Sequence, residues 1–239
     1  MSRKILFLGA VVALVWSTSS RTDSKVLISA GTEIAQSQNP LVIAPIQQQT
    51  NEWCWAASAA MVLQYLHMPA LNADYQCGIV AYAFSQIPAC LVNCLNCPVP
   101  AGQFDNIARV ISQYGAFARL FGIQSPNVHG RWEDRPLTWA EVTDSIDKDS
   151  PIVAGISPNG FSNPLLEPQH AVVIVGYDSS SGNMIYVNDP WMNYLNSGGD
   201  PYLARGATMV SPGQYELSYT AFISMLWNRS IHHMYTSFP

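Results

Sequence analysis

Apolar side chains recur at helical spacing early in the chain. An alanine-rich run over residues 56–66 has high helix propensity. Its larger apolar residues, Val62, Leu63 and Leu66, lie on one face of such a helix, and Pro69 ends it. The pattern predicts one helix here.

Two further helices are predicted before residue 150. Residues 104–114 carry apolar side chains at helical spacing and are followed by Gly115 as a stop signal. Thr138, with Glu141 three residues later, forms a capping box that opens a helix reaching about residue 148.

After residue 150 the pattern changes to that of strands. Short apolar runs at 151–156, 170–177 and 184–188 predict three strands, and the short turn between the last two predicts an antiparallel hairpin. An earlier apolar run at 41–46 contains a proline, so we expect a short edge strand there. The polar, proline-bearing residues 124–136 are expected to form a loop.

The order of these elements predicts an α+β fold in one domain of residues 41–239. Its helical lobe would run from about 50 to 148, and its β-rich lobe from about 150 to 239. A chain of 239 residues can bury a large core. The net charge is −5, with no basic run, which gives no indication of nucleic-acid binding.

The N-terminus has the pattern of an export signal. Arg3 and Lys4 precede an uncharged apolar run over residues 5–16, and small residues follow it. The run is about a dozen residues long, too short to span a bilayer, so we expect no stable membrane insertion. We predict a signal peptide over residues 1–20, a polar linker or short pro-segment over 21–40, and a secreted or periplasmic protein.

One of the five cysteines stands apart from the other four. Cys77, Cys90, Cys94 and Cys97 lie close together, whereas Cys54 is isolated. In an oxidising compartment this division predicts two disulfides and one reactive thiol, with three possible pairings. The alternative is a zinc site, because the spacing of the last three clustered cysteines is typical of metal ligands. No other metal or cofactor site is predicted.

Cys54 lies between two tryptophans at the start of the alanine-rich helix. Asn51 is a candidate N-cap, which would put Cys54 in the first helical turn. The helix dipole and unpaired backbone N–H groups there favour a thiolate over a thiol. The alternative is a buried core thiol, since free cysteine is among the most buried residue types. A glutamine, Gln48, lies six positions before it.

A thiol nucleophile needs a base, a group that orients the base, and donors for the oxyanion. His170 begins the first strand of the predicted hairpin, and the second strand ends at Asn188 and Asp189. The hairpin can therefore return one of these two side chains to the imidazole, and alternation along a strand predicts that only one faces it. By itself His170 would be interpreted as a core histidine. Its coincidence with Cys54 favours catalysis.

Three short motifs within roughly residues 45–195 resemble those of the papain-like cysteine peptidases. They are Gln48-x5-Cys54-Trp55, His170-Ala-Val-Val-Ile-Val-Gly-Tyr and Asn188-Asp189-Pro190-Trp191. Within that group the chain is similar to bacteriocin-processing peptidase domains, staphopains and plant-pathogen effector peptidases with a Trp-Cys-Trp-Ala-Ala core. The resemblance implies a two-lobed fold with an active-site cleft between the lobes.

The resemblance also implies a role for each matching residue. Cys54 would be the nucleophile and His170 the general base and acid. Gln48 would be the side-chain oxyanion donor, working with the backbone N–H of Cys54. The bacterial peptidases orient the histidine with an aspartate before proline, which corresponds to Asp189. Plant papains use an asparagine at the end of this strand, so Asn188 is the alternative.

We therefore expect a secreted thiol endopeptidase that hydrolyses peptide bonds through an acyl-enzyme, acts on a protein or peptide, and needs no cofactor. Three alternatives remain open: an acyl transferase or amidase on the same scaffold, a catalytically inactive peptide-binding module, and a zinc-binding structural protein. His232 and His233, near the C-terminus, are expected to lie in a solvated tail. The sequence does not specify the oligomeric state.

Overall fold

A computed structural model describes most of the chain after the N-terminal segment. The described residues are 37–38, 40–71, 74–97, 104–159, 168–194 and 199–239. The predicted signal peptide, residues 1–20, lies outside them, as does most of the predicted linker, residues 21–40. Among the helices in the described ranges, none has the length and apolar character needed to cross a membrane.

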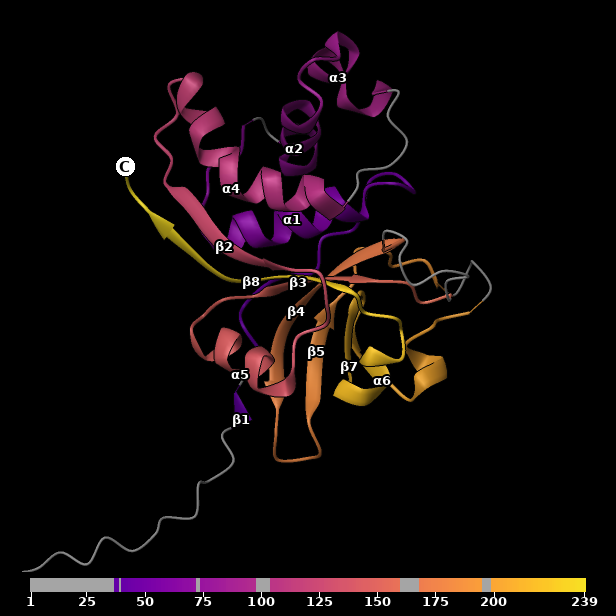
Figure 1. The fold of residues 1–239 in the computed structure, drawn as a ribbon. Helices are drawn as coiled ribbons and strands as arrows, with labels where there is room; N and C mark the ends of the chain where they lie inside the picture. Colours follow the sequence, from indigo (N-terminus) through magenta and orange to yellow (C-terminus); the bar gives the residue numbers. More distant parts are fainter. Residues whose placement is uncertain (1–36, 39, 72–73, 98–103, 160–167, 195–198) are drawn as a thin grey trace, which may run out of the picture. The chain divides into compact units, whose positions relative to one another are not determined.

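The helices divide between the two faces of one sheet (Figure 1). One face is covered by α1 (Cys54–Tyr65), α2 (Tyr75–Ala83), α3 (Pro88–Val92), the 3-10 helix η1 (Cys94–Asn96) and α4 (Phe104–Leu120). The other carries α5 (Trp139–Asp147), η3 (Leu203–Arg205) and α6 (Tyr219–Ile223). Most helices precede most strands in the chain, so the fold is α+β, as predicted.

The strands of the described residues form one eight-stranded sheet with the order β2-β8-β3-β4-β5-β7-β6, and β1 pairs with β4 outside this path. All of these pairings are antiparallel. The strands are β1 (Ser37–Gln38), β2 (Asn127–Glu133), β3 (Ile152–Ile156), β4 (His170–Asp178), β5 (Met184–Asn188), β6 (Thr208–Ser211), β7 (Gln214–Ser218) and β8 (Arg229–Ser237).

Strand β4 lies between two hydrophobic cores. Ala171, Val173 and Val175 face the core that includes α1 and α4. Val172 and Ile174 face the second core, which includes α5 and α6. Successive side chains of a strand point to opposite faces, so a strand buried on both faces is apolar throughout. This explains the unbroken apolar run from which the strand was predicted.

Helix α1 is buried on all sides between α2, α4 and β4. Every residue from Trp55 to Leu63 is buried, and four of these are alanines. Small side chains let neighbouring backbones approach closely, which explains why this central helix is alanine-rich. The position of its first residue, Cys54, is consequently set by core packing.

The N-cap predicted for α1 was wrong. Trp53 occupies the N-cap position and makes no side-chain capping bond. Asn51 lies in the preceding turn, which is closed by a hydrogen bond from Trp53 N to Thr50 O of 3.3 Å. Burial of the Trp53 side chain fixes the start of the helix instead of a polar cap. Cys54 is nevertheless in the first turn, as predicted.

The predicted helix stop at Gly115 was also wrong. Helix α4 continues through Gly115 to Leu120. A Cβ atom at residue 115 would lie 1.8 Å from the carbonyl oxygen of Pro126. The glycine therefore permits the segment before β2 to cross the helix closely, and it does not terminate the helix. The capping box of Thr138 with Glu141 at the start of α5 is confirmed.

Two predicted irregular regions belong to the sheet. The expected loop at 124–136 contains β2, which pairs with β8. His232 and His233 lie on β8, and His232 is only 2% exposed, so the expectation of a solvated tail was wrong. Both strands contain many polar residues and lack an apolar period that would reveal them. Helix α5 packs in the second core, against the sheet. Residues 127–147, which form β2 and α5, therefore belong to the sheet region, although they precede residue 150, where the β-rich lobe was expected to begin.

Residues 41–46 form no strand, contrary to the prediction. Leu41 N donates a 2.7 Å hydrogen bond to Val175 O, so this segment begins beside β4. Pro40 and Pro45 have no backbone N–H, and a strand ladder cannot develop around them. The segment instead leads the chain along the sheet to the loop before α1.

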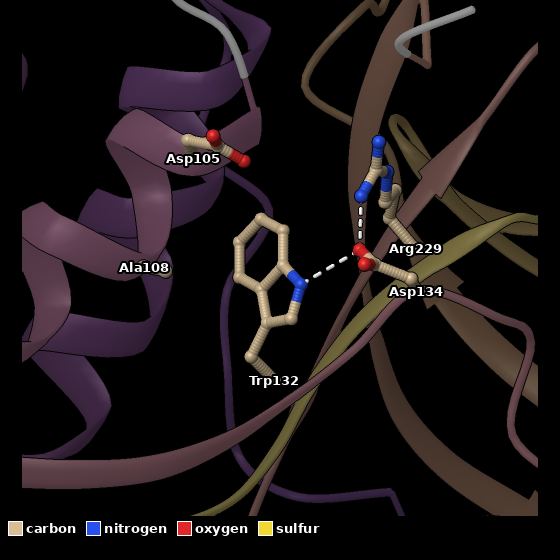
Figure 2. Close-up of a pocket in the computed structure, with 5 residues that line it drawn as sticks. All are labelled: Asp105, Ala108, Trp132, Asp134 and Arg229. Carbon is tan, nitrogen blue, oxygen red and sulfur yellow. Dashed lines mark hydrogen bonds and ion pairs between the residues drawn. The ribbon is translucent and has the colours of Figure 1, made fainter. Parts of the chain in front are cut away.

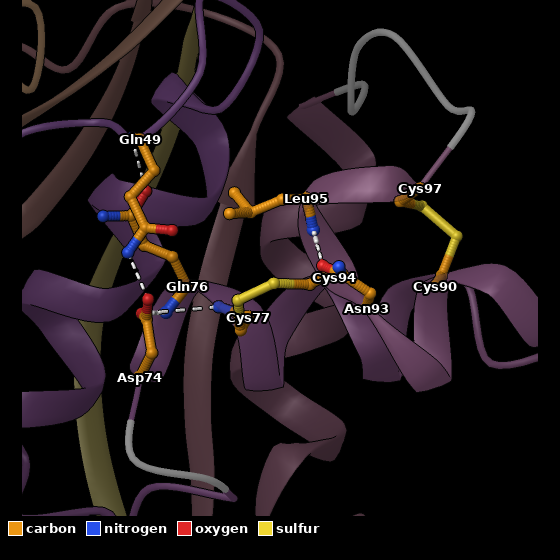
Figure 3. Close-up of a disulfide and its surroundings, with 9 residues drawn as sticks. All are labelled: Gln49, Asp74, Gln76, Cys77, Cys90, Asn93, Cys94, Leu95 and Cys97. Carbon is orange, nitrogen blue, oxygen red and sulfur yellow. Dashed lines mark hydrogen bonds between the residues drawn. A yellow bond between two sulfur atoms is a disulfide. The ribbon is translucent and has the colours of Figure 1, made fainter.

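The four clustered cysteines form two disulfides. Cys77 is joined to Cys94 and Cys90 to Cys97, which leaves Cys54 as the free cysteine (Figure 3). The residues of the alternative zinc site are thus bonded to one another. Elsewhere in the described ranges, no three His, Cys, Asp or Glu side chains are grouped so that they could hold a metal ion.

The disulfides are expected to contribute unequally to stability. Replacing Cys77 and Cys94 by serine should lower the free energy of unfolding by about 3 kcal/mol, because their separation of 17 residues closes a longer loop in the unfolded chain. Replacing Cys90 and Cys97, separated by 7 residues, should cost about 2 kcal/mol. Urea unfolding with Cys54 alkylated measures both values. A larger loss for the second pair would contradict this prediction.

Candidate active site

The packing of α1 on β4 brings Cys54 and His170 together. Cys54 is the first residue of α1, and His170 is the first residue of β4. The two side chains are close enough that Cys54 contributes to raising the pKa of the imidazole. Cys54 as a residue is partly exposed. The packing therefore puts a free cysteine and a histidine together at the start of the helix and of the strand.

A buried hydrogen bond links the helix to the strand next to this pair. Ser58 Oγ donates to the carbonyl oxygen of Ala171 at 2.9 Å. Ser58 lies four residues after Cys54, on the same face of the helix, and Ala171 follows His170 in the strand. The bond therefore fixes the position of α1 along β4 close to Cys54 and His170, and so helps to set the distance between them.

Asp189, and not Asn188, contacts the imidazole. His170 Nε2 lies 2.7 Å from Asp189 Oδ1, and the two side chains are 12% and 0% exposed. The Asn188 amide is used elsewhere: its Nδ2 donates to Ile43 O at 2.8 Å, and its Oδ1 accepts from Gln214 Nε2 at 2.9 Å. Adjacent residues at the end of β5 thus point in different directions.

The Asp189 carboxylate is held by two further donors. The backbone N–H of Trp191 donates to Oδ1 at 2.7 Å, and the Tyr194 hydroxyl donates to Oδ2 at 2.9 Å. A buried carboxylate needs such donors to remain ionised without water. Both oxygens are therefore bonded, and the plane of the carboxylate is fixed relative to the imidazole.

The charge of Asp189 controls the protonation of His170. Burial lowers the pKa of His170, but the negative charge of Asp189, its hydrogen bond and the contact with Cys54 outweigh this and raise the pKa to about 10. The imidazole is therefore protonated at neutral pH. Since Nε2 contacts Asp189, Nδ1 remains for the thiol. An imidazolium in this position is the counter-ion that a nucleophilic thiolate requires.

Sequence analysis missed Tyr194 and the aromatic residues behind it. The Tyr194 ring lies 6.1 Å from that of Tyr202, which stacks on Tyr215 at 4.2 Å. Burial and the nearby Asp189 raise the pKa of Tyr194, so its hydroxyl stays protonated as a donor. Tyr194 and Tyr202 lie between β5 and β6 in a region without a regular period, so no pattern in the sequence pointed to them. Tyr215 lies on β7, where alternate side chains are buried.

Gln48 lies in the loop before α1, next to the end of β5. Its backbone N–H donates to Pro190 O at 3.0 Å, one residue beyond Asp189. Its side chain is buried, and Nε2 donates to Thr50 O at 2.7 Å. Oε1 has no hydrogen-bond partner in the structure as described. A primary amide carries two N–H bonds, so the second donor of Nε2 remains for a ligand.

A pocket of about 390 Å³ opens between α4 and the strands β2 and β8 (Figure 2). Trp132 lies at its centre, with its Nε1 donating to Asp134 at 2.8 Å, and Arg229 forms an ion pair with Asp134. Asp105 and Ala108 of α4 line the opposite side. The pocket therefore combines an indole ring with charged groups of both signs.

Strand register places this pocket near the Cys54–His170 pair. Gly155 of β3 pairs with Arg229 on one side and with Ala171 on the other. Two strand spacings amount to roughly 10 Å, so the pocket lies about that far from the start of β4. The pocket and the Cys54–His170 pair each lie between the sheet and a helix of the face that carries α1 to α4. Both lie at the end of the sheet where β4 and β8 begin.

An α+β protein in which a cysteine at the start of a helix meets a histidine at the start of a strand, with that histidine bonded to an aspartate, has the architecture of a papain-like cysteine peptidase. The model of the Peptidase_C39 like family matches residues 40–216. This match spans more than half of the chain, so the protein belongs to the Peptidase_C39-like family and is a cysteine-type peptidase.

Two other comparisons add little to this assignment. No curated protein matches the sequence significantly. Among solved structures, the chain is similar to the cysteine protease Amb a 11, a major ragweed pollen allergen, in its proform, with a TM-score of 0.49 and 12% sequence identity. That similarity covers 87% of this chain and 67% of the allergen chain.

Asp189→Asn is expected to move the alkaline limit of peptide hydrolysis to lower pH. The imidazolium, which must protonate the leaving amine, persists up to about pH 10 because the charge of Asp189 raises the pKa of His170. Without that charge, burial dominates and the imidazole loses its proton at lower pH. The pH profile of kcat/KM, measured from pH 5 to 11, should show the shift, and its maximum should fall on the order of 100-fold. Asp178→Asn, at the far end of β4, is the control.

An unchanged alkaline limit in Asp189→Asn, or the same shift in Asp178→Asn, would contradict the assignment of this effect to the His170–Asp189 contact.

Tyr194→Phe is expected to lower kcat about tenfold with little change in KM, because it removes one hydrogen bond to a charged carboxylate and keeps the ring. The loss acts through the orientation of His170, so the pH profile of kcat should change as well. Tyr186→Phe removes a comparable hydroxyl bonded to Glu216 and should leave kcat unchanged. Equal effects of the two variants would show that Tyr194 has only a structural role.

Proposed function

We propose that the protein is a thiol endopeptidase that hydrolyses peptide bonds through a Cys54-His170-Asp189 triad and an acyl-enzyme intermediate. The observation that carries this proposal is the buried 2.7 Å contact between His170 Nε2 and Asp189 Oδ1, formed beside a free cysteine at a helix start. Other arrangements of a core histidine do not require all three groups at one point.

In the first step the Cys54 thiolate attacks the carbonyl carbon of the scissile bond. The backbone N–H of Cys54, at the first position of α1, has no acceptor within the helix and can donate to the oxyanion. The second N–H of Gln48 Nε2 would be the other donor. The His170 imidazolium then gives its proton to the leaving amine, and the C–N bond breaks to leave a thioester on Cys54.

In the second step water hydrolyses the thioester. Neutral His170, having lost its proton to the amine, takes a proton from the attacking water, and the C–S bond breaks to release the acid. The Cys54 thiolate and the imidazolium are thereby restored. Asp189 keeps the ring oriented with Nδ1 toward sulfur and stabilises the imidazolium at the start and end of the cycle.

The substrate peptide would lie along the line where the α1–α4 layer meets the sheet. An extended peptide advances about 3.3 Å per residue, so a site roughly 10 Å from the start of β4 corresponds to a side chain two or three residues from the scissile bond. The pocket around Trp132 is placed to receive such a side chain.

The two disulfides support a secreted or periplasmic location. Disulfides persist in oxidising compartments and are rare where thiols are kept reduced. The apolar N-terminal run, which lies outside the described residues, supplies a signal for export by its sequence pattern.

Hydrolysis of labelled casein tests the proposed activity. The wild-type protein should release peptides, and Cys54→Ala and His170→Ala should each lose this activity. His129→Ala, an exposed histidine on β2, should retain it. Quenching in acid should trap a covalent acyl adduct on Cys54, detected by intact mass. Peptide release that persists in Cys54→Ala would refute the triad, and ligated products in place of hydrolysed ones would favour an acyl transferase.

A further inference from the structure

The loop that carries Gln48 has little regular structure of its own. Residues 44–53 contain no helix or strand. Within this loop, Gln48 N is bonded to Pro190 O on the sheet side. A loop held at one point retains conformational freedom, so an oxyanion donor on it would not keep one position. A second attachment of this loop would restrict that freedom.

The side chain of Gln76 makes this second attachment. Its Nε2 donates to Gln47 O at 2.9 Å, and its Oε1 accepts from Gln49 N at 3.2 Å. One amide thus binds the backbone on both sides of Gln48. Gln76 is 3% exposed, so these bonds replace water that the amide would otherwise need.

The base of this attachment is itself anchored. Asp74 caps α2, with Oδ1 accepting from Gln76 N at 2.9 Å, and its Oδ2 accepts from Gln49 Nε2 (Figure 3). The next residue, Cys77, is joined by its disulfide to Cys94 in η1. The first turn of α2 is therefore fixed both to the loop and to the neighbouring 3-10 helix.

We propose that Gln76 is a positioning residue for the oxyanion donor: its amide holds the backbone of Gln47 and Gln49 so that the Gln48 side chain stays aligned with Cys54. This inference rests on the proposed function, in which Gln48 donates to the oxyanion. An amide side chain carries its donor and its acceptor on separate atoms, so it can bind the carbonyl of one residue and the N–H of another at the same time. Gln48 is thus held from the sheet through Pro190 and from α2 through Gln76.

Two variants of Gln76 test the proposal. Gln76→Glu keeps the shape and the acceptor for Gln49 N but loses the donor to Gln47 O, and Gln76→Met loses both bonds. Each should lower kcat for a peptide substrate about 10- to 100-fold, because small displacements of an oxyanion donor have effects of this size. Gln64→Met, an exposed residue near the C-terminal end of α1, is the matched control and should keep the wild-type kcat.

A second readout separates positioning from misfolding. Iodoacetamide alkylates Cys54 by displacement of iodide, a reaction that forms no oxyanion, so its rate depends on the thiolate and His170 but not on Gln48. The alkylation rate should stay within about twofold of wild type in both Gln76 variants. In a Gln48→Ala background, Gln76→Met should lower kcat by no more than about twofold further, because the group that it positions is already gone.

The outcomes distinguish this inference from the function on which it rests. Wild-type kcat in Gln76→Glu and Gln76→Met, a full additional loss in the Gln48→Ala background, or parallel losses of turnover and alkylation would each overturn the role of Gln76 while leaving the peptidase proposal intact. A wild-type protein without Cys54-dependent turnover would overturn the proposed function, and the role of Gln76 with it.

Discussion

The site depends on the alignment of α1 with β4. Cys54 and His170 are the first residues of these two elements, so a small slide of the helix along the strand would separate them. The burial of α1 on all sides resists such a slide. The hydrogen bond from Ser58 to Ala171 fixes the position of the helix along the strand. The packing of α1 and its hydrogen bond to Ala171 take no part in the reaction. They are nevertheless required for every role assigned to the thiol and the imidazole, because they set the distance between the two groups.

The end of β5 supplies the other fixed point. Asp189 orients the imidazole, while its neighbours on either side hold the chain that leads to α1: the Asn188 amide binds Ile43 O, and Pro190 O accepts from Gln48 N. Asp189, whose charge raises the pKa of His170, and the loop that carries Gln48, the proposed oxyanion donor, are thus attached to the same strand end. Asn188 does not face the histidine, but it is buried and hydrogen-bonded because it attaches the segment before α1 to the end of β5.

The sequence predicted the elements whose pattern follows from burial and missed those fixed by other constraints. The alanine-rich helix and the hairpin strands have clear periods, and short motifs singled out Cys54, His170 and Asp189. Strand β2 was missed because its residues are polar and pair only with β8. Gly115 was misread because its close contact with Pro126 is tertiary. Gln76 bonds a segment 29 residues away, and Tyr194 reaches back five residues to Asp189 from outside any regular strand; neither bond follows from a helix or strand period.

The proposed chemistry requires one activated thiol, paired with His170, and four cysteines held in disulfides. The most direct test is the intact mass of the folded protein after iodoacetamide treatment without reductant, followed by peptide mapping. We expect a single adduct, located on Cys54, that forms much more slowly in His170→Ala. No adduct, several adducts, or the same rate in His170→Ala would contradict it.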